Sequence, residues 1–363
     1  MLHSTQDGPQ RVILAGVETD GDRRLFDVEL DELEALARAA GAQVVERVVQ
    51  RRAKLDPSTL VGAGKAEELA TLVRERKANG VIMLNTLRPR QRAALEKIVG
   101  GDAFVLDRNV LILDIFARHA RTAEGKLQVE LAQLRHRAAN LIGARDSLSR
   151  LGGGIGTRGP GETKLEVDRR RIRLRISHLD GQLEQVRKRR REQRRTRADT
   201  PVVALVGHTN AGKSSLLNAL TGAQVFVADQ PFATLDPTLR KLRLDDRGVI
   251  LADTVGFISD LPKELVAAFR ATLEEVTDAT LLLHVVDVSN PFWQRQREAV
   301  EMLLAQLGAG DVPVVIAWNK TDLAPATPFG DGIPVSAKTG AGLPALRAAI
   351  ADALAPPLEV APG

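Results

Sequence analysis

The eight residues GHTNAGKS at positions 207–214 constrain the fold more than any other segment of this 363-residue chain. They fit the pattern G-x-x-x-x-G-K-[ST], whose backbone N–H groups wrap phosphate groups when a strand precedes it and a helix follows. An apolar run at residues 201–206 and a helical segment at 215–222 supply both neighbours, which a chance glycine-rich turn would lack. The segment therefore predicts a strand, a phosphate-binding loop and a helix.

Apolar runs recur at intervals through the C-terminal part of the chain. They are continuous rather than alternating, as in strands that are buried on both faces of a parallel sheet. These runs occupy residues 201–207, 248–254, 279–288 and 313–319. We predict a doubly wound α/β domain over residues 199–355, followed by a flexible tail at 356–363.

The first 120 residues show the same alternation in a second region. Strand-like apolar runs alternate with helix-period stretches such as residues 30–40 and 89–99. The runs lie at residues 11–18, 43–49, 80–85 and 103–107. This order predicts an N-terminal α/β domain with a largely parallel sheet over residues 1–122.

Between these domains the apolar spacing becomes that of paired helices. Two series of apolar residues repeat at alternating intervals of four and three. They are Leu127, Leu131, Leu134, Ala138 and Leu141, and Ile172, Ile176, Leu179, Leu183 and Val186. A glycine-rich loop at 152–161, which can form neither helix nor strand, separates them. We predict an antiparallel helical hairpin over 123–198 with this loop at its tip; two helices that pack separately are the alternative.

Composition limits the function classes. The chain has no cysteine, which excludes disulfides and thiolate metal sites, and its six histidines make other metal sites scarce. Neither a leader-like N-terminus nor an apolar run of about 18 residues is visible, so we expect a cytoplasmic protein without a membrane partner. Basic charge is concentrated at residues 164–197, which hold 14 Lys and Arg against five Asp and Glu. That stripe favours a polyanionic partner.

The phosphate-binding loop assigns chemistry to individual residues. Lys213 would reach the β- and γ-phosphate oxygens, and the Ser214 hydroxyl would hold Mg²⁺. Asp253 ends the next predicted parallel strand, where its carboxylate can hold Mg²⁺ through water. Gly256, three residues later, lets a backbone N–H approach a γ-phosphate. These motifs by themselves indicate a nucleoside triphosphate without naming the base.

A later motif indicates guanine. Residues 319–322, with the sequence NKTD, follow the last long apolar run, at the sheet edge where doubly wound folds bind ligands. The Asp322 carboxylate can accept hydrogen bonds from both N1–H and N2–H₂ of guanine, and adenine lacks this pair of donors. Asp322 should therefore select GTP over ATP. Residues 336–338, with the sequence SAK, would close the other side of the base pocket.

With these motifs in this order, the chain resembles the translation-factor-related GTPases. It resembles most closely the HflX family of ribosome-associated GTPases within the Obg/HflX group. The segments that carry the resemblance are residues 148–166, 232–238 and 253–257. The resemblance extends over nearly the whole chain, and its first segment is long enough to be specific.

The resemblance implies further site residues. In the matched switch segment Thr234 would sense Mg²⁺ and the γ-phosphate, with Thr238 as the alternative; a plain turn at 236–237 is compatible with both. The predicted catalytic set is Lys213, Thr234 and Gly256. The predicted nucleotide-binding set comprises Gly207, His208, Thr209, Asn210, Ala211, Gly212, Lys213, Ser214, Ser215, Phe232, Thr234, Asp253, Gly256, Asn319, Lys320, Asp322, Ser336, Ala337 and Lys338.

Two loop residues bear on catalysis. Phe257 stands where many relatives carry a water-orienting glutamine, and a phenyl ring can neither donate to water nor accept from it. Hydrolysis should therefore be slow until a partner or another switch residue completes the site, even if Phe257 simply packs in the core. Asn210 matches a position that helps to hold K⁺ in certain relatives. The alternative is that asparagine merely tolerates a strained loop conformation there.

The arginine-rich segment is the predicted RNA contact, with a solvated helix face as the alternative. No tyrosine occurs in the chain, and no aromatic residue lies between 117 and 224. Recognition should therefore use phosphates and RNA shape rather than base stacking. The predicted contact residues are Arg158, Arg187, Lys188, Arg189, Arg190 and Arg191.

The resemblance implies the biological role. It predicts a protein that binds GTP or GDP and the large ribosomal subunit with its RNA; we also expect a monomer. Its GTPase activity would promote separation of stalled or idle ribosomes, with hydrolysis controlling release, and the loop at 152–161 would reach the peptidyl-transferase region. A GTP-dependent RNA-binding factor in ribosome assembly or RNA processing is the alternative.

Two other glycine motifs do not predict nucleotide sites. The G-x-G-x-x-G match at 154–159 follows no strand and lies between the two heptad helices. The segment VGAGK at 61–65 lacks the first glycine and the final Ser or Thr of a phosphate-binding loop. We expect Gly62 and Gly64 to be turn residues at a helix start.

Overall fold

The computed structural model describes ten segments of the chain, and the two compact units that it forms are treated one by one. The described residues are 9–19, 21–120, 122–149, 160–195, 200–222, 231–232, 238–244, 247–257, 274–323 and 330–355. The units comprise Met1–Glu184 and Gln185–Gly363. The finer boundaries predicted near residues 122 and 198 stay predictions. None of the helices in the described segments is both long and apolar enough to cross a membrane.

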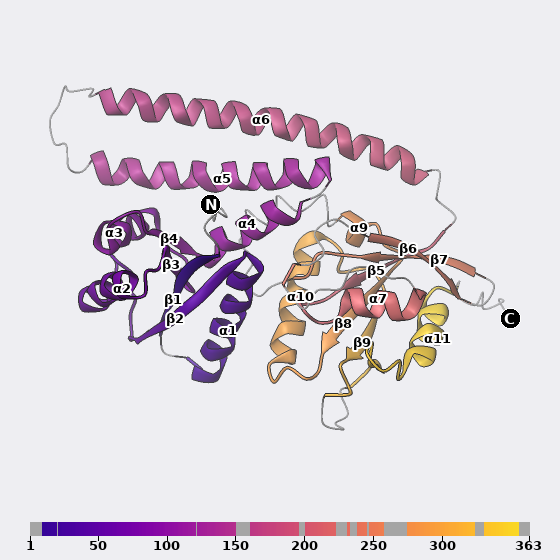
Figure 1. The fold of residues 1–363 in the computed structure, drawn as a ribbon. Coiled ribbons are helices and arrows are strands. Elements are labelled where there is room, and N and C mark those ends of the chain that lie inside the picture. Colours follow the sequence, from indigo (N-terminus) through magenta and orange to yellow (C-terminus); the bar gives the residue numbers. More distant parts are fainter. Residues whose placement is uncertain are drawn as a thin grey trace. The chain divides into compact units, whose positions relative to one another are not determined.

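The first unit is built around a four-stranded parallel sheet in the order β2-β1-β3-β4. Helices cover both of its faces, α1 and α4 on one and α2 and α3 on the other (Figure 1). The bounds are β1 (Gln10–Glu18), α1 (Arg23–Ala39), β2 (Ala42–Arg51), α2 (Ala63–Glu75), β3 (Gly80–Met83), α3 (Pro89–Val99), β4 (Phe104–Asp107) and α4 (Arg108–His119). The predicted N-terminal α/β fold with a parallel sheet is confirmed.

Two long helices, α5 (Ala123–Ser149) and α6 (Pro160–Arg195), run side by side (Figure 1). Leu131 of α5 and Leu179 and Leu183 of α6 form one buried cluster, flanked by other members of the two heptad series. Two ion pairs between the helices accompany this seam, Arg175 Nε–Glu130 Oε1 at 2.7 Å and Arg135 Nη2–Asp180 Oδ1 at 3.0 Å. The helices cover each other's apolar seams, which confirms the hairpin.

The predicted glycine-rich tip at 152–161 falls mainly outside the described residues. Only its last two residues are described, as the first turn of α6. The function predicted for the tip therefore stays a prediction.

The second unit contains a six-stranded sheet in the order β10-β9-β8-β5-β7-β6. All neighbouring strands are parallel except β6 and β7. The bounds are β5 (Val202–Val206), α7 (Lys213–Thr221), β6 (Thr238–Leu244), β7 (Arg247–Asp253), α9 (Glu274–Thr277), β8 (Leu281–Asp287), α10 (Trp293–Leu307), β9 (Val314–Asn319), β10 (Ile333–Pro334) and α11 (Leu343–Ala353). Helices α7 and α11 share the main core with the sheet, whereas α10 faces a cluster around Trp318. The predicted doubly wound fold is confirmed.

The strand order fixes where a ligand can bind in this unit. Strand β5 lies between β7 and β8, so the connections that leave these strands separate at the carboxyl end of β5. In doubly wound sheets such a switch point opens a crevice outside the carboxyl ends of the strands. The predicted phosphate-binding loop follows β5 at that place.

Candidate nucleotide-binding site

The loop after β5 has a backbone that only particular residues can adopt. Gly212, with φ of 92°, precedes the first residue of α7, and a Cβ atom there would lie 2.3 Å from Asn319 Nδ2. Asn210 also has a left-handed backbone, with φ of 60°. Asparagine is one of the few residues with a side chain that visit this region routinely. The loop conformation therefore explains the residue types at these two positions.

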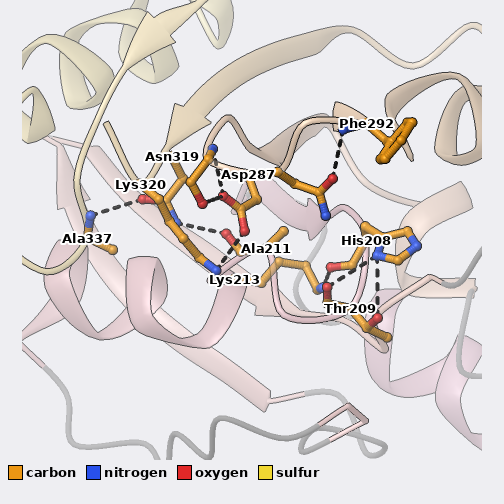
Figure 2. A network of polar contacts seen from close by, with 11 residues as sticks. His208, Thr209, Ala211, Lys213, Asp287, Phe292, Asn319, Lys320 and Ala337 are labelled. Atoms are coloured by element: carbon orange, nitrogen blue, oxygen red, sulfur yellow. Dashed lines mark hydrogen bonds and ion pairs between the residues drawn. The ribbon is translucent and has the colours of Figure 1, made fainter. Parts of the chain in front are cut away.

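Lys213 begins α7 and directs its ammonium group back into the loop (Figure 2). Its Nζ donates hydrogen bonds to the carbonyl oxygens of Gly207 at 3.0 Å and His208 at 2.8 Å. Burial lowers the pKa of Lys213 to about 8, although the nearby Asp253 carboxylate acts in the opposite direction. An anion at the loop would favour the charged form, as a phosphate group does.

Ser214 and Asp253 bring two oxygen ligands together. The Ser214 Oγ donates to Asp253 Oδ2 at 2.6 Å, and the Asp253 side chain is fully buried at the end of β7. Hydroxyl and carboxylate oxygens are hard ligands of the type that Mg²⁺ prefers. The donor set at this point therefore fits a magnesium ion beside the phosphate-binding loop.

The segment after β7 packs directly onto the loop after β5. The N–H of Phe257 donates to the Gly207 carbonyl at 3.0 Å, and the N–H of Thr209 donates to the Phe257 carbonyl at 2.7 Å. A Cβ atom on Gly256 would lie 2.9 Å from Thr209 Cγ2 and 3.2 Å from Lys213 Nζ. Glycine is therefore needed where this segment passes the ammonium group. The Phe257 ring is buried, so it packs in the core.

Asn319, the last residue of β9, links the phosphate side of the site to the base side (Figure 2). Its Nδ2 donates to the Ala211 carbonyl at 2.8 Å, and its Oδ1 accepts from the Ala337 N–H at 3.0 Å. The side chain is fully buried. One amide thus joins the loop after β5 to the loop after β10.

Asp322 lies on the exposed side of the same turn. Its Oδ1 accepts a hydrogen bond from Ser336 Oγ at 2.7 Å, and Ser336 Oγ accepts in turn from the Thr339 N–H at 3.1 Å. The Ser336 hydroxyl is the main cause that holds the pKa of Asp322 below its usual range. An ionised, oriented carboxylate at this position can accept hydrogen bonds from two adjacent donors.

Sequence reasoning did not single out Asp287, which belongs to the site by geometry. This residue ends β8, and its Oδ2 lies 2.7 Å from Lys320 Nζ (Figure 2). It is paired in register with Asn319 across the two strands. The sequence does show an aspartate at the carboxyl end of an apolar run. No motif surrounds this aspartate, so its position alone did not indicate a site.

Other predicted nucleotide residues lie near this core or outside the described part. Ser215 is the third residue of α7, and Lys338 is exposed in the loop after β10. Phe232 is buried. Thr234 lies outside the described residues, whereas Thr238 begins β6 opposite Asp253. The choice between the two threonines stays open.

The predicted RNA contacts are described only in part. Lys188 and Arg189 are exposed on α6. The side chains of Arg158, Arg187, Arg190 and Arg191 lie outside the described residues. As expected for the segment VGAGK, Gly62 caps the N-terminus of α2, whereas Gly64 is the second residue of that helix and not a turn residue.

Family models match three successive parts of the chain. Residues 27–117 match "GTP-binding GTPase N-terminal", and residues 119–197 match "GTP-binding GTPase Middle Region". Residues 202–320, which contain most of the site, match "50S ribosome-binding GTPase". The matches cover both units of the structure.

Curated relatives carry the name GTPase HflX. The chain is 48% identical to that of Caldanaerobacter subterraneus subsp. tengcongensis, over 99% of this chain and 84% of the relative. It is 46% identical to that of Escherichia coli K12, over 96% of this chain and 84% of the relative. Among solved structures, the SsGBP complex with GDP covers 94% of this chain and 98% of its own, with a TM-score of 0.54 and 23% identity. That likeness supports the fold alone.

Proposed function

Because the chain belongs to the HflX family of GTPases, we propose that it binds and hydrolyses GTP at the carboxyl edge of the six-stranded sheet and thereby controls its binding to the large ribosomal subunit. The observation that carries this proposal is the network in which Asn319 joins the phosphate-binding loop to the base-side loop. That network joins the loops that carry the residues proposed to bind phosphate and guanine.

Guanine recognition rests on Asp322. Its carboxylate, oriented by Ser336, would accept hydrogen bonds from N1–H and N2–H₂ of the base. ATP would leave that carboxylate without matching donors, and a polar group without partners disfavours the wrong ligand strongly. The site would therefore select guanine nucleotides.

Phosphate binding rests on the loop after β5. Lys213 would exchange its two carbonyl acceptors for β- and γ-phosphate oxygens. Ser214 and Asp253 would hold Mg²⁺, which supplies positive charge to the same phosphates. Gly256 would offer its N–H to the γ-phosphate, and Thr234, or Thr238 in its place, would respond to the γ-phosphate from the switch segment.

Hydrolysis by the isolated protein should be slow. The buried phenyl ring of Phe257 cannot orient the attacking water. A partner would complete the site, and K⁺ held near Asn210 would add positive charge to the phosphates. The left-handed backbone of Asn210 also supports the alternative, in which asparagine serves only the loop conformation.

We propose the large ribosomal subunit and its RNA as the partner, and separation of stalled or idle ribosomes as the outcome. The match of residues 202–320 to a model described as a 50S ribosome-binding GTPase supports the partner. The exposed basic residues Lys188 and Arg189 support contact with RNA phosphates. Hydrolysis would lower the affinity for the subunit and release a cytoplasmic, monomeric protein.

The test is GTP turnover by the purified protein, alone and with large ribosomal subunits, in potassium and in sodium buffers. The variant Lys213→Ala serves as the inactive control. Strong stimulation by the subunit, and faster turnover in potassium, is the expected result. Normal GTP binding without stimulation would discard ribosome-activated hydrolysis and direct the search to other RNAs.

A further inference from the structure

We propose that Asp287 is a positioning residue for guanine-nucleotide binding and that it acts through Lys320. The two side chains form an ion pair beside the base-side loop, with Asp287 Oδ2 and Lys320 Nζ 2.7 Å apart. This inference rests on the proposed binding of guanine nucleotides and adds a residue to it. None of the sequence motifs of the site contains Asp287.

The backbone of Lys320 is strained, and an ion pair on its side chain can help to hold that conformation. Its φ of 66° lies in the left-handed region, which is unfavourable for a residue with a Cβ atom. This turn stands between Asn319 and Asp322, so it sets how the buried amide and the exposed carboxylate are placed relative to each other. A restraint on the Lys320 side chain therefore also restrains the loop that would hold the base.

Asp287 is well placed to provide that restraint. Its other oxygen, Oδ1, accepts hydrogen bonds from the Ser289 N–H at 3.0 Å and from Ser289 Oγ at 2.5 Å. The N–H of Val288 donates to the Asn319 carbonyl at 3.1 Å, which ties the two strand ends together. These hydrogen bonds orient the Asp287 carboxylate toward Lys320.

The ion pair between Asp287 and Lys320 is partly buried, so water and salt screen it only in part. The side chains of Asp287 and Lys320 are 15% and 25% exposed, respectively. Pairs of exposed charges contribute little, whereas partly buried charges are less screened by water and salt. The pair lies close to the bond between Asn319 and Ala211, as Figure 2 shows, so its loss should reach the nucleotide site.

The experiment measures dissociation of a fluorescent N-methylanthraniloyl derivative of GDP by stopped-flow. Both tryptophans of the chain, Trp293 and Trp318, pack against each other next to Asn319 and can serve as energy donors. Asp287→Ala should accelerate dissociation about tenfold, which corresponds to a moderate coupling between neighbouring side chains. Asp287→Asn, which keeps an oxygen for Lys320 but loses the charge, should have a smaller effect.

The decisive control is Lys320→Gly, because glycine adopts the left-handed backbone without a partner. In that background Asp287→Ala should change dissociation by less than about twofold. A merely structural role of Asp287 would instead accelerate dissociation by the same factor in both backgrounds.

The outcomes separate the inference from the proposed function. Equal effects of Asp287→Ala with lysine and with glycine at 320 would overturn the role of the pair while leaving the GTPase intact. If Asp287→Ala does not fold, Asp287→Asn decides in the same two backgrounds. A wild-type protein that binds no guanine nucleotide would overturn the proposed function, and this inference with it.

Discussion

The sheet of the first unit is parallel and that of the second is largely parallel, and both units place polar side chains at the carboxyl ends of their strands. In the first unit these side chains bind their own scaffold. Asn85 accepts from the Val17 N–H at 2.8 Å and donates to the Val17 carbonyl at 3.1 Å. Both oxygens of Asp107 accept from backbone N–H groups, those of Leu87 and Val110, at 3.0 Å.

The second unit treats the corresponding edge differently. Lys213 donates to two carbonyl groups of its own loop, and a phosphate group could replace both acceptors. Asp322 is held by one hydroxyl and is otherwise exposed. The architecture that the two units share therefore does not by itself make a binding site. Loops that hold exchangeable polar groups make one.

The largest effect should come from the exposed carboxylate. Asp322→Asn replaces the carboxylate, which has two acceptor oxygens, by an amide with one oxygen and an NH₂ donor. Both hydrogen bonds from the base to a charged group are then lost. GTP should bind about 1,000-fold more weakly, as expected for two such bonds. Equilibrium titration with GTP measures this change. Asp107→Asn in the first unit is the matched control and should leave GTP affinity unchanged; a loss of affinity there would mean that the carboxylate of the first unit also supports nucleotide binding.

The scaffold carboxylate should instead control stability. Asp107 is buried, and Arg92 Nη2 lies 3.5 Å from its Oδ2. Asp107→Ala would leave a buried N–H of Leu87 and a cation without their acceptor, which should lower the free energy of unfolding by about 3 kcal/mol.

Urea denaturation can assign that loss to one unit. Trp293 and Trp318 are the only tryptophans in the chain, and both lie in the second unit. Tryptophan fluorescence should therefore keep its midpoint, while circular dichroism should show earlier unfolding of the first unit. A shift of both signals together would mean that the two units unfold cooperatively. The effect of Asp107 on stability would then not be confined to the first unit.

The buried ammonium group predicts a dependence on pH. Burial lowers the pKa of Lys213 to about 8, so the charged form is present below that pH and is lost above it. Bound phosphates would raise the pKa again, which means that binding takes up a proton in alkaline solution. GTP affinity should then fall about tenfold between pH 7 and pH 9. Fluorescence titrations across this range measure it.

Lys213→Arg is the control for this slope, because a guanidinium keeps its charge throughout the range. The guanine base also loses its N1 proton in alkaline solution, and that contribution is the same for both proteins. The difference between their slopes isolates the lysine. Equal slopes would show that Lys213 does not change its protonation state on binding.

The sequence predicted the fold class because its signals are local and repeated. Continuous apolar runs predicted the parallel strands of both sheets, and the heptad series predicted the hairpin whose seam contains Leu131, Leu179 and Leu183. The motifs also predicted the loops around Lys213, Asp253 and Asn319, which the structure brings to one sheet edge. Their roles toward a nucleotide stay predictions.

What the sequence did not predict depends on contacts between distant residues. Asp287 belongs to no motif, and only the register between β8 and β9 places it beside the turn of Lys320. Phe257 pairs with Gly207 and Thr209 through backbone groups, which every residue type has, so the sequence could not predict this pairing. The role of Thr234 and the contact of the loop at 152–161 with the peptidyl-transferase region were predicted from the resemblance. Thr234 lies outside the described residues, as does the loop apart from the start of α6.

The smallest effect should come from Ser336, whose hydroxyl donates a hydrogen bond to Asp322. Its hydroxyl lowers the pKa of Asp322, so the carboxylate stays ionised to a lower pH than usual. Ser336→Ala removes one hydrogen bond to a charged group and should weaken GDP binding about fivefold at neutral pH.

A pH profile shows whether Ser336 acts through Asp322. A depressed carboxylate pKa preserves affinity above that pKa and loses it as the pH falls through it. In Ser336→Ala the pKa returns toward its ordinary value, so the acid loss of GDP affinity should begin at a higher pH than in the wild type. Weaker binding with an unmoved acid limb would mean that Ser336 shapes the loop without tuning Asp322. The contrast between the two sheet edges would then rest on exposure alone.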